Sequence, residues 1–177
     1  MEIIYRHAVP QDAEEIQAIY RYYVENTVVT FRTVNLSVEH YLEQIVHSPY
    51  PFWVAVGDGR VLGFAYAGRM RPQEAYLWDV ELSIFLHVDA PGRQGIGRAL
   101  YQKLLDELAE LGFNNAHAVI TGSNEQSIRF HDGMGFAELV RFPKTGFKHG
   151  AWHDMVWMHK LLRPLDDAPE LPVPFRK

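Results

Sequence analysis

The sequence predicts an α/β (α+β) fold, with one domain in which helices flank a mixed central sheet. The chain has 177 residues, 47% of them apolar and 22% charged, as expected for a single globular domain. Some stretches alternate apolar and polar residues, and others repeat apolar residues every three or four positions, which indicates strands and helices. The order β-α-α-β-β-β-α-β-α-β-β is typical of helices covering a mixed sheet.

The first predicted elements are a strand at 3–8 and two helices. A helix follows Pro10, with Asp12 as its cap and Glu15 as the reciprocal partner of the cap. A second helix is predicted from Ser37 to about Val46. The residues expected to face the core are Ile16, Ile19, Tyr20 and Tyr23 from the first helix and Tyr41, Leu42 and Ile45 from the second.

The period then changes to that of strands. FWVAVG and RVLGFAYAG, joined by Asp58-Gly59, predict a tight hairpin. YLWDVELSIFLHV, at 76–88, predicts a long strand with two different faces. One face carries Val80, Leu82, Ile84, Leu86 and Val88, and the other carries Glu81, Ser83, Phe85 and His87.

The remaining elements alternate down to a proline-rich tail. A helix is expected over 97–111, with leucines at 100, 104, 108 and 111 on one face and Gly112 ending it. NAHAVI predicts a strand, and Ser123 with Gln126 predicts a capping box for a short helix that Gly135 ends. FAELV and HDMVWMHKL predict the last strands. We therefore expect a domain over 1–163 and an extended or disordered tail over 164–177.

Composition excludes several classes of function. The chain has no cysteine, which rules out disulfides, thiolate nucleophiles and cysteine metal sites. A net charge of −5 argues against a nucleic-acid-binding scaffold, which usually carries a basic stripe. No apolar run approaches the roughly 20 residues that span a bilayer. Acidic residues come too early for a signal peptide, so we expect a cytoplasmic protein without a membrane or nucleic-acid partner.

The stretch VDAPGRQGIGRAL, at 88–100, places glycines between a strand and a helix. It is neither the dinucleotide motif G-x-G-x-x-G nor a P-loop, which requires G-x-x-x-x-G-K-[ST]. Gly95 and Gly97 let the backbone approach a ligand, and the first N–H groups of the helix are free to bind an anion. Arg93 and Arg98 add positive charge. The loop alone is equally consistent with a tight turn beside a solvated arginine.

The order of the motifs resembles the GCN5-related N-acetyltransferase (GNAT) superfamily. TVVTFRT, AYAG, AYLWDVELSIFLHV, GIGRALYQKLL, SNEQSIRFHDGMGF and GFKHGAWHDMVWM resemble its phosphinothricin and methionine sulfoximine N-acetyltransferase family over roughly 3–162. The resemblance implies acetyl-CoA as cosubstrate, with its pyrophosphate on the glycine loop. Gly92 stands where the superfamily loop usually begins with Gln or Arg. The cofactor-binding residues implied are Ile84, Phe85, Leu86, Arg93, Gln94, Gly95, Ile96, Gly97, Arg98 and Asn124, the last of which is alternatively a simple helix cap.

Acetylation of an amine requires a base, and Glu81 is our candidate. It interrupts an apolar strand, so desolvation should raise its pKa, and the resemblance implies the same role. Its alternative is a structural pair with an arginine. His131 stands seven residues after Asn124, where the superfamily often has a tyrosine that protonates the leaving thiolate. It is the candidate acid, or alternatively a packing or capping histidine.

The resemblance also implies a substrate pocket formed by Phe31, Arg71, Tyr76 and Phe85, with Arg71 gripping an anionic group. Gln73 replaces a second basic residue, which favours a neutral sulfoximine or sulfone over a phosphinate. Thr121-Gly122-Ser123 replaces the usual Leu-Pro stretch, so Thr121 lines a pocket of different shape. The stretch GFKHGAWHD completes it in our interpretation, through Lys148, His149, Trp152 and His153, from this chain or from the partner in a homodimer.

The prediction is therefore an acetyl-CoA-dependent N-acetyltransferase that acetylates the α-amine of a small amino-acid analogue. Without cysteine, the amine attacks the thioester directly. One alternative is another amine: a polyamine, an aminoglycoside or a protein N-terminus. Another is a non-catalytic acyl-CoA-binding sensor. No metal is expected, because His149 and His153 have no evident third ligand.

Overall fold

The computed structural model describes residues 2–92 and 94–175, and its elements follow the predicted order. Two short 3₁₀ turns, Pro10–Asp12 and Glu74–Tyr76, were not predicted. The helices and strands are β1 (Ile3–His7), α1 (Ala13–Asn26), α2 (Val38–His47), β2 (Phe52–Gly57), β3 (Arg60–Arg69), β4 (Asp79–Leu86), α3 (Ile96–Glu110), β5 (Asn115–Thr121), α4 (Glu125–Gly133), β6 (Ala137–Lys148) and β7 (Ala151–Leu161).

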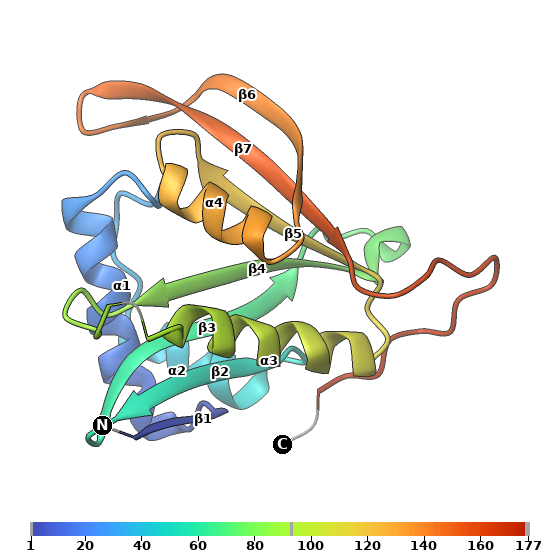
Figure 1. The fold of residues 1–177 in the computed structure, drawn as a ribbon, viewed down its shortest axis with the longest axis horizontal. Helices are drawn as coiled ribbons and strands as arrows, with labels where there is room; N and C mark the ends of the chain where they lie inside the picture. The colour runs from blue at the N-terminus through green and yellow to red at the C-terminus, as the bar shows by residue number, and fades with distance from the viewer. Residues whose placement is uncertain (1, 93, 176–177) are drawn as a thin grey trace.

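The seven strands form one mixed sheet in the order β1-β2-β3-β4-β5-β7-β6. Among the strands of the described residues, only β4 and β5 pair in parallel, and α3 makes the crossover between them. The hairpin of β6 and β7 is attached to the rest of the sheet through β7, which pairs with β5. The hairpin projects beyond the rest of the domain (Figure 1). The predicted α/β fold is confirmed.

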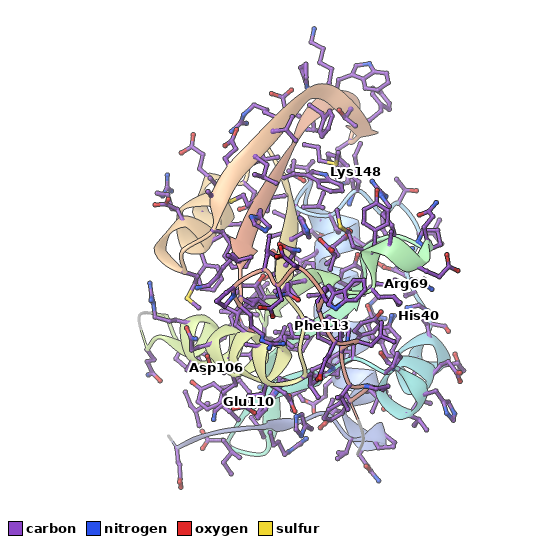
Figure 2. All side chains as sticks on the ribbon, turned by 90° about the vertical axis from the view of Figure 1, so that its right-hand side faces the viewer. His40, Arg69, Asp106, Glu110, Phe113 and Lys148 are labelled. Carbon is purple, nitrogen blue, oxygen red and sulfur yellow. The ribbon has the colours of Figure 1, made fainter. Side chains whose placement is uncertain are left out.

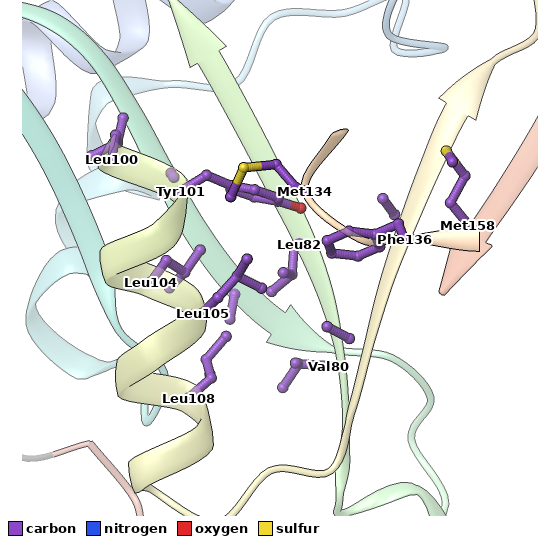
Figure 3. Packing of buried hydrophobic residues seen from close by; sticks show 14 of the residues in the cluster. Val80, Leu82, Leu100, Tyr101, Leu104, Leu105, Leu108, Met134, Phe136 and Met158 are labelled. Atoms are coloured by element: carbon purple, nitrogen blue, oxygen red, sulfur yellow. The ribbon is translucent and has the colours of Figure 1, made fainter. Parts of the chain in front are cut away.

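Two apolar cores lie on opposite faces of the sheet. On one face, α1 and α2 pack with Phe52, Val54 and Phe64 of the sheet. On the other, the apolar face of α3 packs against Val80 and Leu82 of β4 (Figure 3). Alternate residues of β4 thus serve different cores, as the strand period requires. The predicted split of this strand into two faces is confirmed over β4.

Two predicted capping boxes are wrong. The Asp12 carboxylate binds the Arg6 guanidinium at 2.6 and 2.8 Å, and Glu15 accepts from the Val61 N–H at 2.9 Å. Asp12 occupies the cap position of α1 as predicted, but its carboxylate makes no cap bond to that helix and accepts instead from Arg6 and from the Val9 N–H at 2.8 Å. At α4 the cap is Asn124, whose side chain accepts from the Ser127 N–H at 3.2 Å. The helix begins one residue later than a Ser123 cap would require.

The strand predicted over 76–88 is shorter than expected. Tyr76 ends a 3₁₀ turn, and Val88 lies beyond the strand, 50% exposed. The Trp78 carbonyl accepts from the N–H groups of both Asn114 and Asn115, so the parallel ladder ends there. The strand therefore begins at Asp79, which follows directly.

The described part of the tail, 164–175, has no helix or strand and returns along the domain (Figure 1). The Trp78 indole donates to the Glu170 carbonyl at 2.7 Å, and the Val173 N–H donates to Leu111 at 2.7 Å. The Phe175 ring lies 4.7 Å from the His7 ring, centre to centre. These contacts fit the extended alternative for this segment. No helix within the described ranges is long and apolar enough to cross a membrane.

Candidate active site

The central feature of the site is a split between the two parallel strands. Pairing of β4 with β5 stops at Leu82 and Ala118, while β4 continues against β3 as far as Leu86. The two strands then diverge, and an open groove of about 600 Å³ lies between them. Residues 83–86 therefore present backbone groups to the groove that no neighbouring strand uses.

The N-terminus of α3 closes one end of this groove. Gly95 caps the helix in the left-handed conformation, with φ 70° and ψ 14°, which glycine adopts without strain. The N–H groups of the first turn have no acceptor within the helix and lie beside the groove, as an anion site requires. Arg98 also lines the groove, and its guanidinium donates to the Gly133 carbonyl at 2.8 Å. Arg93 lies outside the described residues.

Every described residue that the sequence analysis assigned to the cofactor lines this one groove. The set comprises Ile84, Phe85, Leu86, Gln94, Gly95, Ile96, Gly97, Arg98 and Asn124. Tyr23 also lines it and donates its hydroxyl to the Leu86 carbonyl at 2.7 Å, which fixes the end of β4. Its helical spacing predicted only a core position, so this contact was missed.

His131 lines the same groove, but both of its ring nitrogens are engaged. Nδ1 lies 2.8 Å from the Ser127 carbonyl, so it carries the proton and donates. Nε2 then accepts from the buried Tyr101 hydroxyl at 3.1 Å. Burial lowers the pKa of His131, opposed in part by the Ser127 hydrogen bond. The arrangement is that of a neutral imidazole.

Glu81 lies one residue before the groove begins, half-buried on β4. Its neighbour across the parallel ladder is His117, and its neighbour on β3 is Gly68. Burial raises the pKa of Glu81, and the charges of Arg71 and His117 oppose that shift. A carboxylate with a raised pKa is suited to take a proton from an amine near neutral pH.

The residues predicted to bind the amine substrate lie on different segments and differ in exposure. Arg71, Gln73 and Tyr76 are exposed on the connection from β3 to β4, and the Arg71 guanidinium lies 5.3 Å from the centre of the Trp157 ring. Thr121 is buried, and its hydroxyl donates to the Val28 carbonyl at 2.6 Å. It fixes the loop that carries Phe31.

The hairpin of β6 and β7 contacts the same loop. Lys148 is buried where the hairpin meets the loop between α1 and α2, and its ammonium donates to the Thr30 carbonyl at 2.9 Å (Figure 2). Burial lowers the pKa of Lys148. His149 donates to the Thr27 carbonyl at 3.2 Å, and His153 donates to the Lys148 carbonyl at 3.0 Å. Trp152 points elsewhere and is 61% exposed.

A group of polar residues next to Glu81 was not predicted from the sequence. His117 donates through Nε2 to the Asp79 carboxylate at 2.9 Å, and its ring lies 6.2 Å from Trp157, centre to centre. A histidine that interrupts the apolar run NAHAVI is the same kind of signal that identified Glu81. The register that brings the two together is visible only in the folded chain. No group of three possible metal ligands occurs among the residues that the structure describes.

Comparison with known proteins identifies the family of the chain. The family model of the acetyltransferase (GNAT) domain matches residues 6–157. A phosphinothricin N-acetyltransferase from Streptomyces viridochromogenes is 32% identical over 95% of this chain and 93% of its own length. An L-methionine sulfoximine/L-methionine sulfone acetyltransferase from Salmonella typhimurium is 31% identical over 86% of this chain and 91% of its own.

Solved structures give the same result. A GNAT superfamily phosphinothricin acetyltransferase from Sinorhizobium meliloti, in complex with acetyl-CoA, superposes with a TM-score of 0.85 at 38% identity. The superposition covers 91% of this chain and 89% of that one. The family match spans the strand split, the glycine cap of α3 and the carboxylate on β4. The chain belongs to the GNAT acetyltransferase family and is an N-acetyltransferase.

Proposed function

We propose that the protein transfers the acetyl group of acetyl-CoA to the α-amine of a small amino-acid analogue, with Glu81 as general base. Methionine sulfoximine, methionine sulfone and phosphinothricin are the candidate substrates, because relatives that act on them match nearly the whole chain. The observation that carries the proposal is the position of Glu81, a half-buried carboxylate one residue before the groove begins.

The groove fits acetyl-CoA, which is the acetyl donor. The first turn of α3 would bind the pyrophosphate through its free N–H groups and the positive end of the helix. Pairing of β4 with β5 stops at Leu82, so the backbone groups of 83–85 that face away from β3 would bind the pantetheine arm as an added strand does. With no cysteine in the chain, the amine attacks the thioester carbonyl directly. The N–C bond forms as the C–S bond breaks.

Arg71 is the candidate for the anionic group of the substrate. Its guanidinium packs on the Trp157 ring, and its charge reaches Glu81, whose pKa it lowers. Gripping the α-carboxylate would bring the adjacent α-amine toward Glu81. Gln73 stands in place of a second positively charged residue. We therefore propose a preference for the neutral sulfoximine or sulfone over phosphinothricin.

The test is release of free CoA from acetyl-CoA with a panel of amines. The panel contains methionine sulfoximine, methionine sulfone, phosphinothricin, spermidine and an aminoglycoside. We expect turnover with the amino-acid analogues. Turnover only with spermidine or the aminoglycoside would keep the N-acetyltransferase and reject the proposed substrate. Binding of acetyl-CoA without any turnover would favour a sensor.

The proton donor to the CoA thiolate is either His131 or water. Because both nitrogens of His131 are engaged in its neutral form, we expect His131→Gln to lower kcat less than about tenfold. Loss of the Tyr101 contact should lower the free energy of unfolding by about 1–3 kcal/mol. Steady-state kinetics and denaturant unfolding measure both. A fall in kcat of about 10²-fold or more at unchanged KM would instead identify His131 as the acid.

We propose that the protein is a homodimer that pairs through β6. This edge strand carries large apolar side chains that are exposed, as a self-complementary interface requires. They are Leu139, Val140, Phe142 and Phe147. Light scattering should give a mass of about twice 20.4 kDa for the wild type and a monomer for Phe142→Glu. Leu165→Glu, in the tail, is the control and should remain dimeric. A monomeric wild type would reject the proposal.

A further inference from the structure

Three titratable side chains lie side by side across the sheet. Glu81 of β4 is paired in register with His117 of β5, and His117 is paired with His159 of β7. Residues paired in this way point to the same face of a sheet, on strands about 4.8 Å apart. Side chains in direct cross-strand positions interact. The row begins at the candidate base.

His117 is hydrogen-bonded to one carboxylate of β4, that of Asp79, and is paired in register with a second, Glu81. Its side chain is only 9% exposed, and its Nε2 lies 2.9 Å from the Asp79 carboxylate. Since a carboxylate only accepts hydrogen bonds, Nε2 carries the proton. The other nitrogen, Nδ1, then has no proton and presents a lone pair. Nδ1 is buried and has no hydrogen-bond partner in the structure. Buried polar atoms are rarely left so, and an imidazole oriented by a carboxylate is ready to accept a proton.

We propose that His117, oriented by Asp79, takes the proton that Glu81 removes from the amine and so returns Glu81 to its ionised form. The transfer runs to Nδ1 through one water, and His159 carries the proton on toward solvent. His117 acts through Glu81 and is therefore a positioning residue. This inference rests on the proposed function, in which Glu81 is the base.

The proton balance is complete without any further reactant. A substrate ammonium loses two protons when it becomes an amide. One is released through Glu81 and His117 to solvent, and the other ends on the CoA sulfur as the C–S bond breaks. Glu81 starts the next turnover ionised.

Several titratable and charged groups lie around His117. Asp79 and Glu81 face it from β4, and His159 faces it from β7. The Arg71 guanidinium lies over the neighbouring Trp157 ring, and its charge acts on Glu81. Burial lowers the pKa of His159, the charge of His117 lowers it further, and Asp79 opposes both. The two rings lie 5.1 Å apart, centre to centre, so the step from His117 to His159 is short.

The experiment compares His117→Ala, His117→Gln and the control His47→Ala, a histidine on α2 whose side chain is 65% exposed. With the amine that the wild type acetylates best, we expect kcat to fall about 10²-fold in both His117 variants and to be unchanged in the control. Added imidazole should restore His117→Ala, which leaves a cavity, but not His117→Gln. The pH dependence of kcat should regain its wild-type shape under rescue.

The outcomes are distinct. If kcat of both His117 variants stays within about twofold of wild type, the relay is rejected. If activity is lost with unchanged thermal stability and imidazole restores nothing, His117 is structural and the relay is again rejected. His117→Gln, which can still donate to Asp79, guards against misfolding of the alanine variant. A wild type that acetylates no amino-acid analogue rejects the proposed function instead, and Glu81→Gln with full activity rejects the base.

Discussion

Replacing Glu81 by Gln is expected to lower kcat by about 10²–10⁴-fold while the Kd for acetyl-CoA stays unchanged. The amide keeps the size of the side chain but cannot accept a proton, and Glu81 lies just outside the groove that would hold the cosubstrate. In the wild type, kcat/KM should fall as the pH drops below the raised pKa of Glu81. Steady-state kinetics over a pH series measure both. Glu14→Gln, on an exposed position of α1, is the matched control.

The same substitution should stabilise the fold at neutral and higher pH. Because burial raises the pKa of Glu81 in the folded state, its stabilising contribution is present below the ordinary glutamate pKa of about 4.3. That contribution is lost as the pH rises through the folded-state pKa. The Tm of Glu81→Gln should therefore exceed that of the wild type at pH 8, and the difference should vanish near pH 4. A lower Tm at pH 8 would show that the charge of Glu81 is well compensated.

Replacing Gly97 by Leu is expected to weaken acetyl-CoA binding at least about tenfold, or 1.4 kcal/mol, without weakening the fold. Gly97 is in the first turn of α3 and lines the groove, so a long side chain would enter the space proposed for the cosubstrate. Leucine favours the helix over glycine by up to about 1 kcal/mol. The affinity for acetyl-CoA, measured by calorimetric titration, should therefore fall, while the Tm, measured by thermal unfolding, should not fall.

Gly97→Ala separates bulk from the loss of glycine itself. A Cβ at this position would lie 3.5 Å from Leu86, 3.7 Å from Phe130 and 3.8 Å from Ile84, which are ordinary contact distances. We expect the alanine variant to bind acetyl-CoA nearly as the wild type does. Equal affinity for all three proteins would place the cosubstrate outside this groove.

The sequence predicted the fold and one wall of the site well, because both depend on local pattern. Strand and helix periods set the order of elements, and Gly95 with Gly97 marked the start of α3 within one residue. The position of the groove then follows, because it is lined by β4, the strand that precedes these glycines. The parts that failed are hydrogen-bond choices between near neighbours, as where Asp12 binds Arg6 instead of capping α1.

The neighbours of Glu81 could not be predicted because they come from distant segments. His117 lies beside Glu81 only after α3 has crossed the sheet and the register of β4 with β5 is set. A shift of one residue would turn the His117 side chain to the other face, into the apolar core with Ala116 and Ala118. Periodicity predicts the face on which a residue lies, but it does not determine which residue is its cross-strand partner.

The strand order also sets a constraint on how the chain folds. β6 is synthesised before β7, yet in the finished sheet it is β7 that pairs with β5. Until β7 is available, the apolar strand β5 has an open edge, which is a site for mispairing. Productive folding therefore requires β6 and β7 to pair as a hairpin that docks onto β5 through β7. Slow closure of that hairpin would expose β5 to aggregation, so substitutions in its turn at His149 and Gly150 should affect refolding yield more than native stability.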